Sequence, residues 1–324
     1  MKIIPALVAG AVIALLPFVL SGYHQGIASY VAIYFIAILG LNVVTGYTGQ
    51  ISIGHGAFMA IGGYTTAIMS HDHHTSLIAT LPLSFAITFG CGVAVGLPAS
   101  RLSGVYLALA TLALAVSVPQ LAIKFSHFTG ARNGISVDGR VGYLWLYGVS
   151  WTCAAILFVL AWVVLRGRTG RAFRAVRDSE VAAASSGVSI VLYKTLAFGI
   201  SAAFAGVAGS LFVLATNGYA QPDEFSISLS LNVLIGAAVA GLGSLWGVFA
   251  GAAFVALLPN ISQSAPLIGS IHGQDVAFGV VVILVMLLLP TGFAGLLQRI
   301  AVALSAGGRF RQSKTPRSAP EPPV

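Results

Sequence analysis

The chain has 324 residues, of which 16 are Lys or Arg and 8 are Asp or Glu, so 7% are charged, against roughly 25% in a typical soluble domain. Together with a hydrophobic fraction of 57% and a mean hydropathy of +0.95, this excludes a soluble globular domain, a collagen, a disordered chain and a disulfide-stapled secreted module. What remains is an integral membrane protein.

The uncharged stretches between charged residues set the number of spans, because a helix needs about 20 apolar residues to cross the hydrocarbon core. Residues 3–71 have room for three helices, 73–100, 102–123, 141–165 and 195–222 for one each, 225–274 for two, and 276–298 for one. The stretches lack the alternation of apolar and polar residues that is typical of barrel strands. We expect an all-α membrane domain over residues 1–305 with about ten spans. A re-entrant segment at 47–70 or within 225–274 would lower the number to eight or nine.

The two ends of the chain carry further expectations. Residues 3–20 follow Lys2 as in a signal peptide, but the run is long and lacks a small-x-small cleavage site, so a retained first span is expected. Residues 306–324 are rich in Gly, Ser, Pro and Arg and are expected to form a disordered basic tail.

Basic residues predict the orientation, because Lys and Arg concentrate in cytoplasmic loops. With ten spans, 13 of the 16 basic residues fall on one side, in the loop 166–194, after residue 298, at Lys2 and at Arg101. Both termini are therefore expected in the cytoplasm. The net charge of +8 is a topology signal that favours anionic lipid as a contact and does not indicate nucleic acid.

Several kinds of chemistry are missing from the sequence. The expected span interiors hold no Asp, Glu, Lys or Arg, and His55 is the ionisable side chain expected there, which disfavours proton coupling. The phosphate-binding pattern GxxxxGK[ST] is absent, so any ATP hydrolysis belongs to another chain. The cluster at 71–74 (His-Asp-His-His) is read as a solvated loop. We expect a conduit without cofactor or metal, and not an enzyme.

A Gly-rich early segment interleaves glycines with polar residues. Irregular backbone at membrane depth is tolerated where it is covered by protein or lines a cavity, so this segment is a candidate for the translocation path, with simple helix packing as the alternative. The polar candidates are Asn42, Thr45, Gln50, Ser52 and His55, and Asn232 in a later span repeats the Leu-Asn-Val context of Asn42.

The loop 166–194 predicts a short amphipathic helix. Arg171, Arg174 and Asp178 fall on one helical face, and Phe173 and Val176 on the other. Gly187 is placed to end the helix. A surface helix in a positively charged loop is the simpler interpretation. The small residues that follow, however, would let a partner approach closely, which favours a docking element.

These segments resemble a known family. The loop is similar to the cytoplasmic coupling loop of ABC importer permeases, in the form found in branched-chain amino-acid permeases. The residues that carry this resemblance are Gly170, Arg171, Arg174, Arg177, Glu180, Ala182, Ala183 and Gly187. The segment 40–64 and the later motifs at 193–209, Pro222 and 241–247 follow the family pattern in order, so the likeness spans about residues 30–295. One departure is that Val181 separates Glu180 from the alanine pair.

The resemblance implies the permease subunit of an inner-membrane ABC importer for branched-chain or similar aliphatic amino acids. Its implied partners are a second homologous permease, two cytoplasmic ATPase subunits and an extracytoplasmic solute-binding protein. One alternative keeps the class and changes the cargo to urea, short amides or another small polar solute. Another is a channel or secondary transporter that works without ATP, and a third is a membrane scaffold.

Overall fold

The computed structural model describes Pro17, residues 21–139, 141–216 and 218–263, and isolated positions between 279 and 295. Its elements in chain order are α2 (Gly22–Leu41), the π-helix η2 (Asn42–Tyr47), α3 (His55–His73), α4 (Leu77–Ala99), α5 (Val105–Lys124), α6 (Ser126–Thr129), the 3-10 turn η3 (Ala131–Asn133), β1 (Ile135–Ser136), α7 (Tyr143–Arg166), α8 (Arg168–Asp178), α9 (Glu180–Ser185), α10 (Ile190–Ala215), β2 (Tyr219–Ala220), the 3-10 turn η4 (Pro222–Phe225), α11 (Ile227–Ala240) and α12 (Gly247–Gln263). The all-α membrane fold is confirmed. The short strands β1 and β2 pair antiparallel, with Ile135 opposite Ala220.

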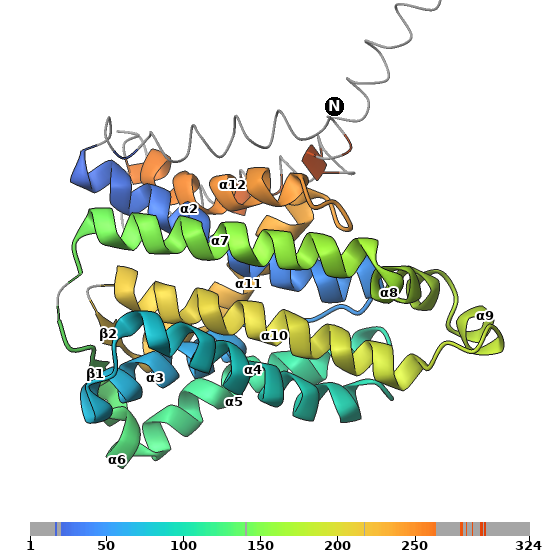
Figure 1. Ribbon diagram of the computed structural model, residues 1–324, viewed down its shortest axis with the longest axis horizontal. Helices are drawn as coiled ribbons and strands as arrows, with labels where there is room; N and C mark the ends of the chain where they lie inside the picture. The colour runs from blue at the N-terminus through green and yellow to red at the C-terminus, as the bar shows by residue number, and fades with distance from the viewer. Residues whose placement is uncertain are drawn as a thin grey trace, which may run out of the picture.

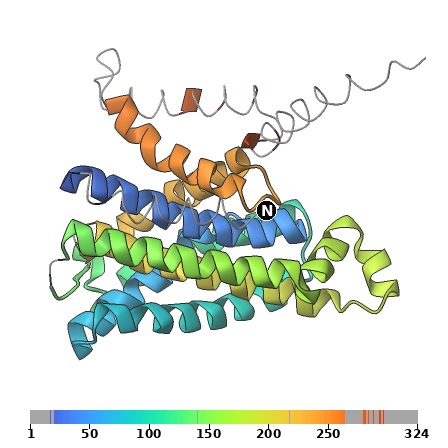
Figure 2. The same cartoon turned by 45° about the horizontal axis from the view of Figure 1, so that its top comes forward.

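Two long helices form the centre of the bundle. Buried residues make up 89% of the most apolar stretch of α10 and 78% of that of α2 with η2, against 28% in α4, α5 and α7. α10 packs on α4, α3 and α2, while α7 and α12 pack on α2 (Figures 1 and 2). The peripheral helices therefore bury one side only, as expected where lipid or another subunit covers the rest.

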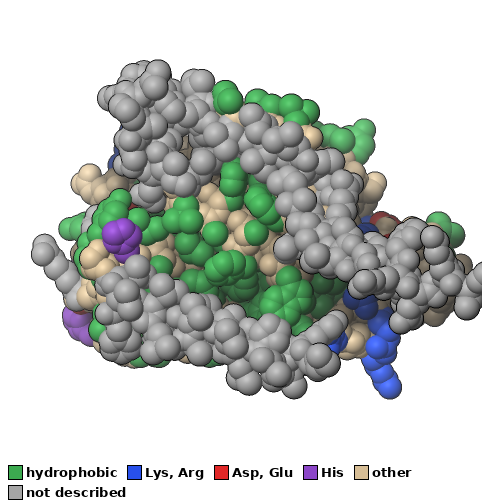
Figure 3. All heavy atoms as spheres, turned by 90° about the horizontal axis from the view of Figure 1, so that it is seen from above, with side chains coloured by type: hydrophobic (Ala, Val, Ile, Leu, Met, Phe, Trp, Pro, Cys, Tyr) green, Lys and Arg blue, Asp and Glu red, His purple; other side chains and the backbone are tan. Residues whose placement is uncertain are grey.

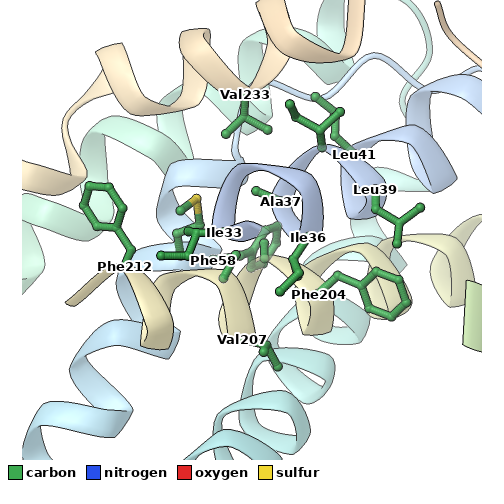
Figure 4. Packing of buried hydrophobic residues seen from close by; sticks show 14 of the residues in the cluster. Ile33, Ile36, Ala37, Leu39, Leu41, Phe58, Phe204, Val207, Phe212 and Val233 are labelled. Atoms are coloured by element: carbon green, nitrogen blue, oxygen red, sulfur yellow. The ribbon is translucent and has the colours of Figure 1, made fainter. Parts of the chain in front are cut away.

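Aliphatic and aromatic side chains fill the space between the central helices. Ile33 and Ile36 of α2 and Phe204 of α10 are fully buried in one cluster, shown from close by in Figure 4. Phe58 of α3 and Val233 of α11 belong to the same cluster. The core therefore joins four helices that are far apart in the sequence.

Glycines allow the helices around α10 to approach closely. A Cβ at Gly62 of α3 would meet the backbone of Gly206, and one at Gly92 of α4 would meet Ala202 and the Phe198 carbonyl. Such crossings are typical of membrane helices, whose association depends on close van der Waals packing. Gly243 and Gly247 have the GxxxG spacing of close helix contacts, but Gly243 lies in the turn before α12, with a φ of +83°, and so does not take part in a helix crossing.

Helices occupy the uncharged stretches as expected wherever the chain is described. Six helices of the described residues are long and apolar enough to cross a membrane. α3 and α12 add two shorter or less apolar helices in the expected places. Apart from Pro17 and the isolated positions between 279 and 295, the predicted spans at 3–20 and 276–298 and the tail 306–324 lie outside the described residues.

The Gly-rich stretch 47–70 passes through the bundle and does not turn back. After η2, residues 48–54 run without regular structure, and α3 then continues to His73. η2 contacts α8 at one end of the bundle, while α3 contacts β1 at the other. The segment thus links the two ends, and its helix begins inside the protein.

Candidate functional site

Charged residues divide between the two ends of the bundle. α8 and α9 project at one end, and β1, β2 and α6 lie at the other (Figure 1). Viewed from above, most of the visible Lys and Arg side chains lie at the first end and the His side chains at the second, with hydrophobic side chains between them (Figure 3). At the second end His74 pairs with Asp138, Nδ1 to Oδ2 at 2.9 Å. The α8–α9 end is thus the strongly basic one.

The predicted amphipathic helix is α8. Gly170, Ala172, Phe173 and Val176 are buried on one face, and Arg171 is exposed. The Phe173 ring packs edge-on against Tyr193 at the start of α10, with centroids 6.2 Å apart. A Cβ at Gly170 would collide with the Leu165 backbone, so the sharp bend between α7 and α8 requires glycine there.

The helix ends earlier than the sequence pattern indicates, and a second short helix follows. Ser179 adopts an extended conformation, and its Oγ accepts a hydrogen bond from the Ala182 N–H at 3.3 Å. This serine therefore caps α9 and interrupts the helix. Gly187, with a φ of +79°, ends α9 as predicted.

The residues of α9 differ in their exposure to solvent. Val181 is 78% exposed, and Ala182 and Ala184 are also exposed, whereas Ala183 is buried. An exposed valine flanked by small side chains forms a compact apolar surface at the tip of the basic end. Of the predicted alanine pair, only Ala182 is available to a partner in this chain.

The charged side chains of the predicted docking set mostly contact their own chain. Arg174 Nη1 donates to the Leu165 carbonyl at 3.4 Å. Glu180 Oε1 lies 2.7 Å from the ammonium of Lys194, whose side chain is only 4% exposed. Arg177 Nη1 donates to the Gly46 carbonyl at 2.9 Å. These contacts fix α8 and α9 to η2 and to the base of α10.

Asn42 and two neighbouring candidates lie around η2. The Asn42 amide donates to the Ser244 carbonyl at 2.9 Å and accepts from the Gly243 N–H at 2.8 Å. Thr45 Oγ1 donates to the Gln50 carbonyl at 3.1 Å. These bonds hold the π-helix and the chain that leaves it. π-Helical turns often occur at functional sites.

The remaining early candidates line the entry into α3. Ser52 Oγ accepts from the Gly54 N–H at 3.4 Å. His55 Nε2 lies 2.8 Å from Ser201 Oγ, and Ser201 donates to the Gly40 carbonyl at 2.7 Å. Because that hydroxyl proton is already used, Nε2 carries the proton of His55 and Nδ1 is an acceptor. Nδ1 has no hydrogen-bond partner among the described residues.

Several polar residues at this site were missed in the sequence. Ser230 of α11 accepts from the Gly56 N–H at 2.9 Å, and Thr111 of α5 accepts from the Ile53 N–H at 3.0 Å. Asn232, which was among the predicted candidates, hydrogen-bonds Tyr34 of α2. Hydroxyl groups from two helices, α11 and α5, thus accept hydrogen bonds from the backbone at the entry into α3. A serine or threonine within an apolar run is the only signal that the sequence offers for them.

Two cavities lie beside the segment of residues 48–69. The larger, of about 450 Å³, is lined by apolar side chains of α3, α4 and α5, among them Ile61, Ile87 and Val118, and by Tyr64. The smaller, of about 130 Å³, lies at the α8 end and is lined by Gln50, Arg177, Glu180 and Lys194, among others. Residues 48–69 contribute to both cavities.

Known proteins resemble this chain over most of its described residues. Residues 23–290 match the family described as the permease component of branched-chain amino acid transport systems. The high-affinity branched-chain amino acid transport system permease protein LivM of Salmonella typhimurium is 35% identical over 263 residues, and that of Escherichia coli is 34% identical. Each alignment covers 72% of this chain and 62% of LivM, so the chain spans about three fifths of those relatives.

The permease protein LivH of Salmonella typhimurium, from a transport system of the same description, is a more distant relative. It is 25% identical over 286 residues, which cover 81% of this chain and 91% of LivH. No solved structure matches the chain.

Proposed function

The chain belongs to the family of permease components of branched-chain amino acid transport systems, and we propose that it is the membrane-spanning subunit of an ABC importer for branched-chain or similar aliphatic amino acids. The observation that carries this proposal is the α8–α9 projection at the basic end of the bundle, in a chain whose family match covers residues 23–290. ATP hydrolysis would belong to separate subunits.

In this proposal α9 is the ATPase docking surface. Val181, Ala182 and Ala184 are exposed at its tip, and Arg171 of α8 is available to pair with a carboxylate of the partner. An apolar anchor surrounded by charged groups is the usual anatomy of an energetically important contact. Arg174, Arg177 and Glu180 would support this surface from within the chain.

The translocation path would follow residues 48–69, which line both cavities. The apolar cavity beside Tyr64 suits an aliphatic side chain. His55, Gln50 and Ser52 lie further along the same segment, toward the α8 end. Asn42, Thr45 and Asn232 would hold the neighbouring helices in place, since their polar groups bond within the bundle.

The proposed assembly has a defined orientation. The α8–α9 end would face the cytoplasm of the cell, because basic loops are retained there. Two ATPase subunits would bind at that face, a solute-binding protein at the opposite one, and a second, LivH-like permease beside the bundle in the inner membrane.

The docking surface is tested with Val181→Arg. The change places a charge in the centre of the proposed apolar contact, so we expect the chain to insert and fold normally while the ATPase no longer co-purifies. His73→Arg, at an exposed position at the opposite end of the bundle, serves as the matched control and retains the ATPase. Normal ATPase recovery with Val181→Arg would contradict the assignment of α9.

A further inference from the structure

One side chain connects the proposed coupling segment to the centre of the bundle. Arg177, in the last turn of α8, extends its guanidinium to the Gly46 carbonyl at 2.9 Å. Its stem lies against Gly49, where an added Cβ would come within 2.9 Å of Arg177 Cγ. Gly49 also has a φ of +71°. Glycine at this position therefore clears the way for the arginine as well as permitting the turn.

The acceptor belongs to the last turn of η2. Carbonyl groups at the C-terminal end of a helix lack intrahelical partners and form the negative end of its dipole, so a cation there is stabilised. Gly46 is itself enclosed, because a Cβ would collide with Asn42 Oδ1 and with the Gly243 nitrogen. Arg177 thus binds a carbonyl that has little freedom to move independently of its neighbours.

Asn42 extends this connection to the turn after α11. Its amide exchanges two hydrogen bonds with that turn, to the Ser244 carbonyl at 2.9 Å and from the Gly243 N–H at 2.8 Å. α8, the end of α2 and the end of α11 are therefore joined through Arg177, Gly46 and Asn42. A displacement of α8 along the Arg177 side chain must move this junction or break one of its bonds.

The surroundings leave room for such a displacement. The 130 Å³ cavity borders Arg177 and Val176 of α8, Gln50 of the irregular segment and Gly104 before α5. Gln50 Oε1 is buried there without a hydrogen-bond partner in the described part of the chain. The face of α8 that carries Arg177 is thus incompletely packed.

We infer that Arg177 is a positioning residue that transmits the movement of α8 and α9 to η2, and through Asn42 to α11, rather than a residue that touches the ATPase. This inference rests on the proposed importer function. It divides the basic residues of α8 into a transmitter, Arg177, whose guanidinium bonds the Gly46 carbonyl, and a docking group that includes Arg171.

The test uses the complete complex of both permeases and the ATPase subunits in vesicles, with the binding protein and labelled leucine. The quantity measured is leucine imported per ATP hydrolysed. For Arg177→Gln we expect ATPase recovery and hydrolysis as in the unmodified complex but a ratio about tenfold lower, the loss that corresponds to one charge-assisted hydrogen bond. Arg177→Lys keeps the charge and should give an intermediate ratio.

The matched control is Arg168→Gln, which removes an exposed arginine from the first turn of the same helix and should leave the ratio unchanged. An unchanged ratio with Arg177→Gln would overturn the inference, and so would equal losses of assembly and import with the ratio preserved.

A second variant keeps the test decisive if Arg177→Gln does not assemble. Asn42→Ala leaves α8 untouched and breaks the connection on its far side, so it should also lower the ratio while the ATPase stays bound. A normal ratio with Asn42→Ala would contradict the transmission role. Failure of the proposed function itself is distinguishable, because the unmodified chain would then recover no ATPase.

Discussion

Lys194 is a charged residue in a buried position. Its side chain is 4% exposed at the base of α10, and its ammonium is 2.7 Å from Glu180, which is 47% exposed. A buried ammonium is costly unless a carboxylate compensates it. Glu180 therefore stabilises the connection between α9 and α10, whatever it also contributes to a partner.

Removing the Glu180 carboxylate alone should lower the free energy of unfolding more than removing both Glu180 and Lys194. We expect Glu180→Ala to cost about 1–3 kcal/mol, because it leaves the Lys194 charge buried and unpaired. The double variant Glu180→Ala with Lys194→Met should recover most of this loss. The midpoint of thermal unfolding in detergent measures the difference.

Asp178→Ala provides the comparison, since its ion pair with Arg177 is exposed on both sides and exposed pairs contribute little. If Glu180→Ala unfolds at the same temperature as Asp178→Ala, Lys194 does not depend on the carboxylate.

The sequence indicated which residues were candidates for the site, but it did not indicate their interaction partners. The candidate status of His55 followed from its Gly-rich neighbours, but its partner Ser201 lies 146 residues away. Nothing local in the sequence relates them. Glu180 begins α9 and Lys194 lies near the start of α10, so their pairing depends on the fold of the turn between the two helices.

At the scale of helices, α10 is held to its neighbours by backbone contact. Gly62 of α3 lies where a Cβ would collide with the Gly206 backbone, while Gly90 of α4 has nothing within 4 Å of its Cβ position. The two glycines thus have different reasons to be present. Only the first is required by packing.

These positions make a matched pair of substitutions. Gly62→Ala should force α3 away from α10 and cost about 1–3 kcal/mol, as overpacking does. Gly90→Ala should be neutral or stabilising by up to about 1 kcal/mol, because alanine is the better helix former. Thermal unfolding of both variants in the same detergent checks this, and equal stability of the two would contradict the close crossing.

The type of element was easier to predict than its boundaries. Long uncharged runs predict helices because backbone groups in lipid must bond within their own segment, and the described helices occupy the predicted runs. The break at Ser179 was not predicted, because the helical spacing of charges continues past it. Nor was the π-helix at 42–47, whose partners, Arg177 and the turn at 241–244, are distant in the sequence.

For the whole molecule, the division of charges between its two ends was predictable from the positive-inside rule. Arg101 and the loop 166–194 were expected on one side, and the loop after Arg101 indeed lines the same small cavity as Arg177. The sequence does not indicate which exposed faces of the bundle a partner subunit would cover. The peripheral helices α4, α5 and α7 expose apolar faces that suit lipid and a second permease equally well.

The central claim is that this chain moves a branched-chain amino acid only as part of an ATP-driven complex, and import into vesicles tests it most directly. Vesicles that contain the chain, a LivH-like permease and both ATPase subunits should accumulate labelled leucine when binding protein is outside and ATP inside. Vesicles that contain the chain alone should not. Uptake by the chain alone, without ATP, would contradict the account and identify an ATP-independent channel or secondary transporter.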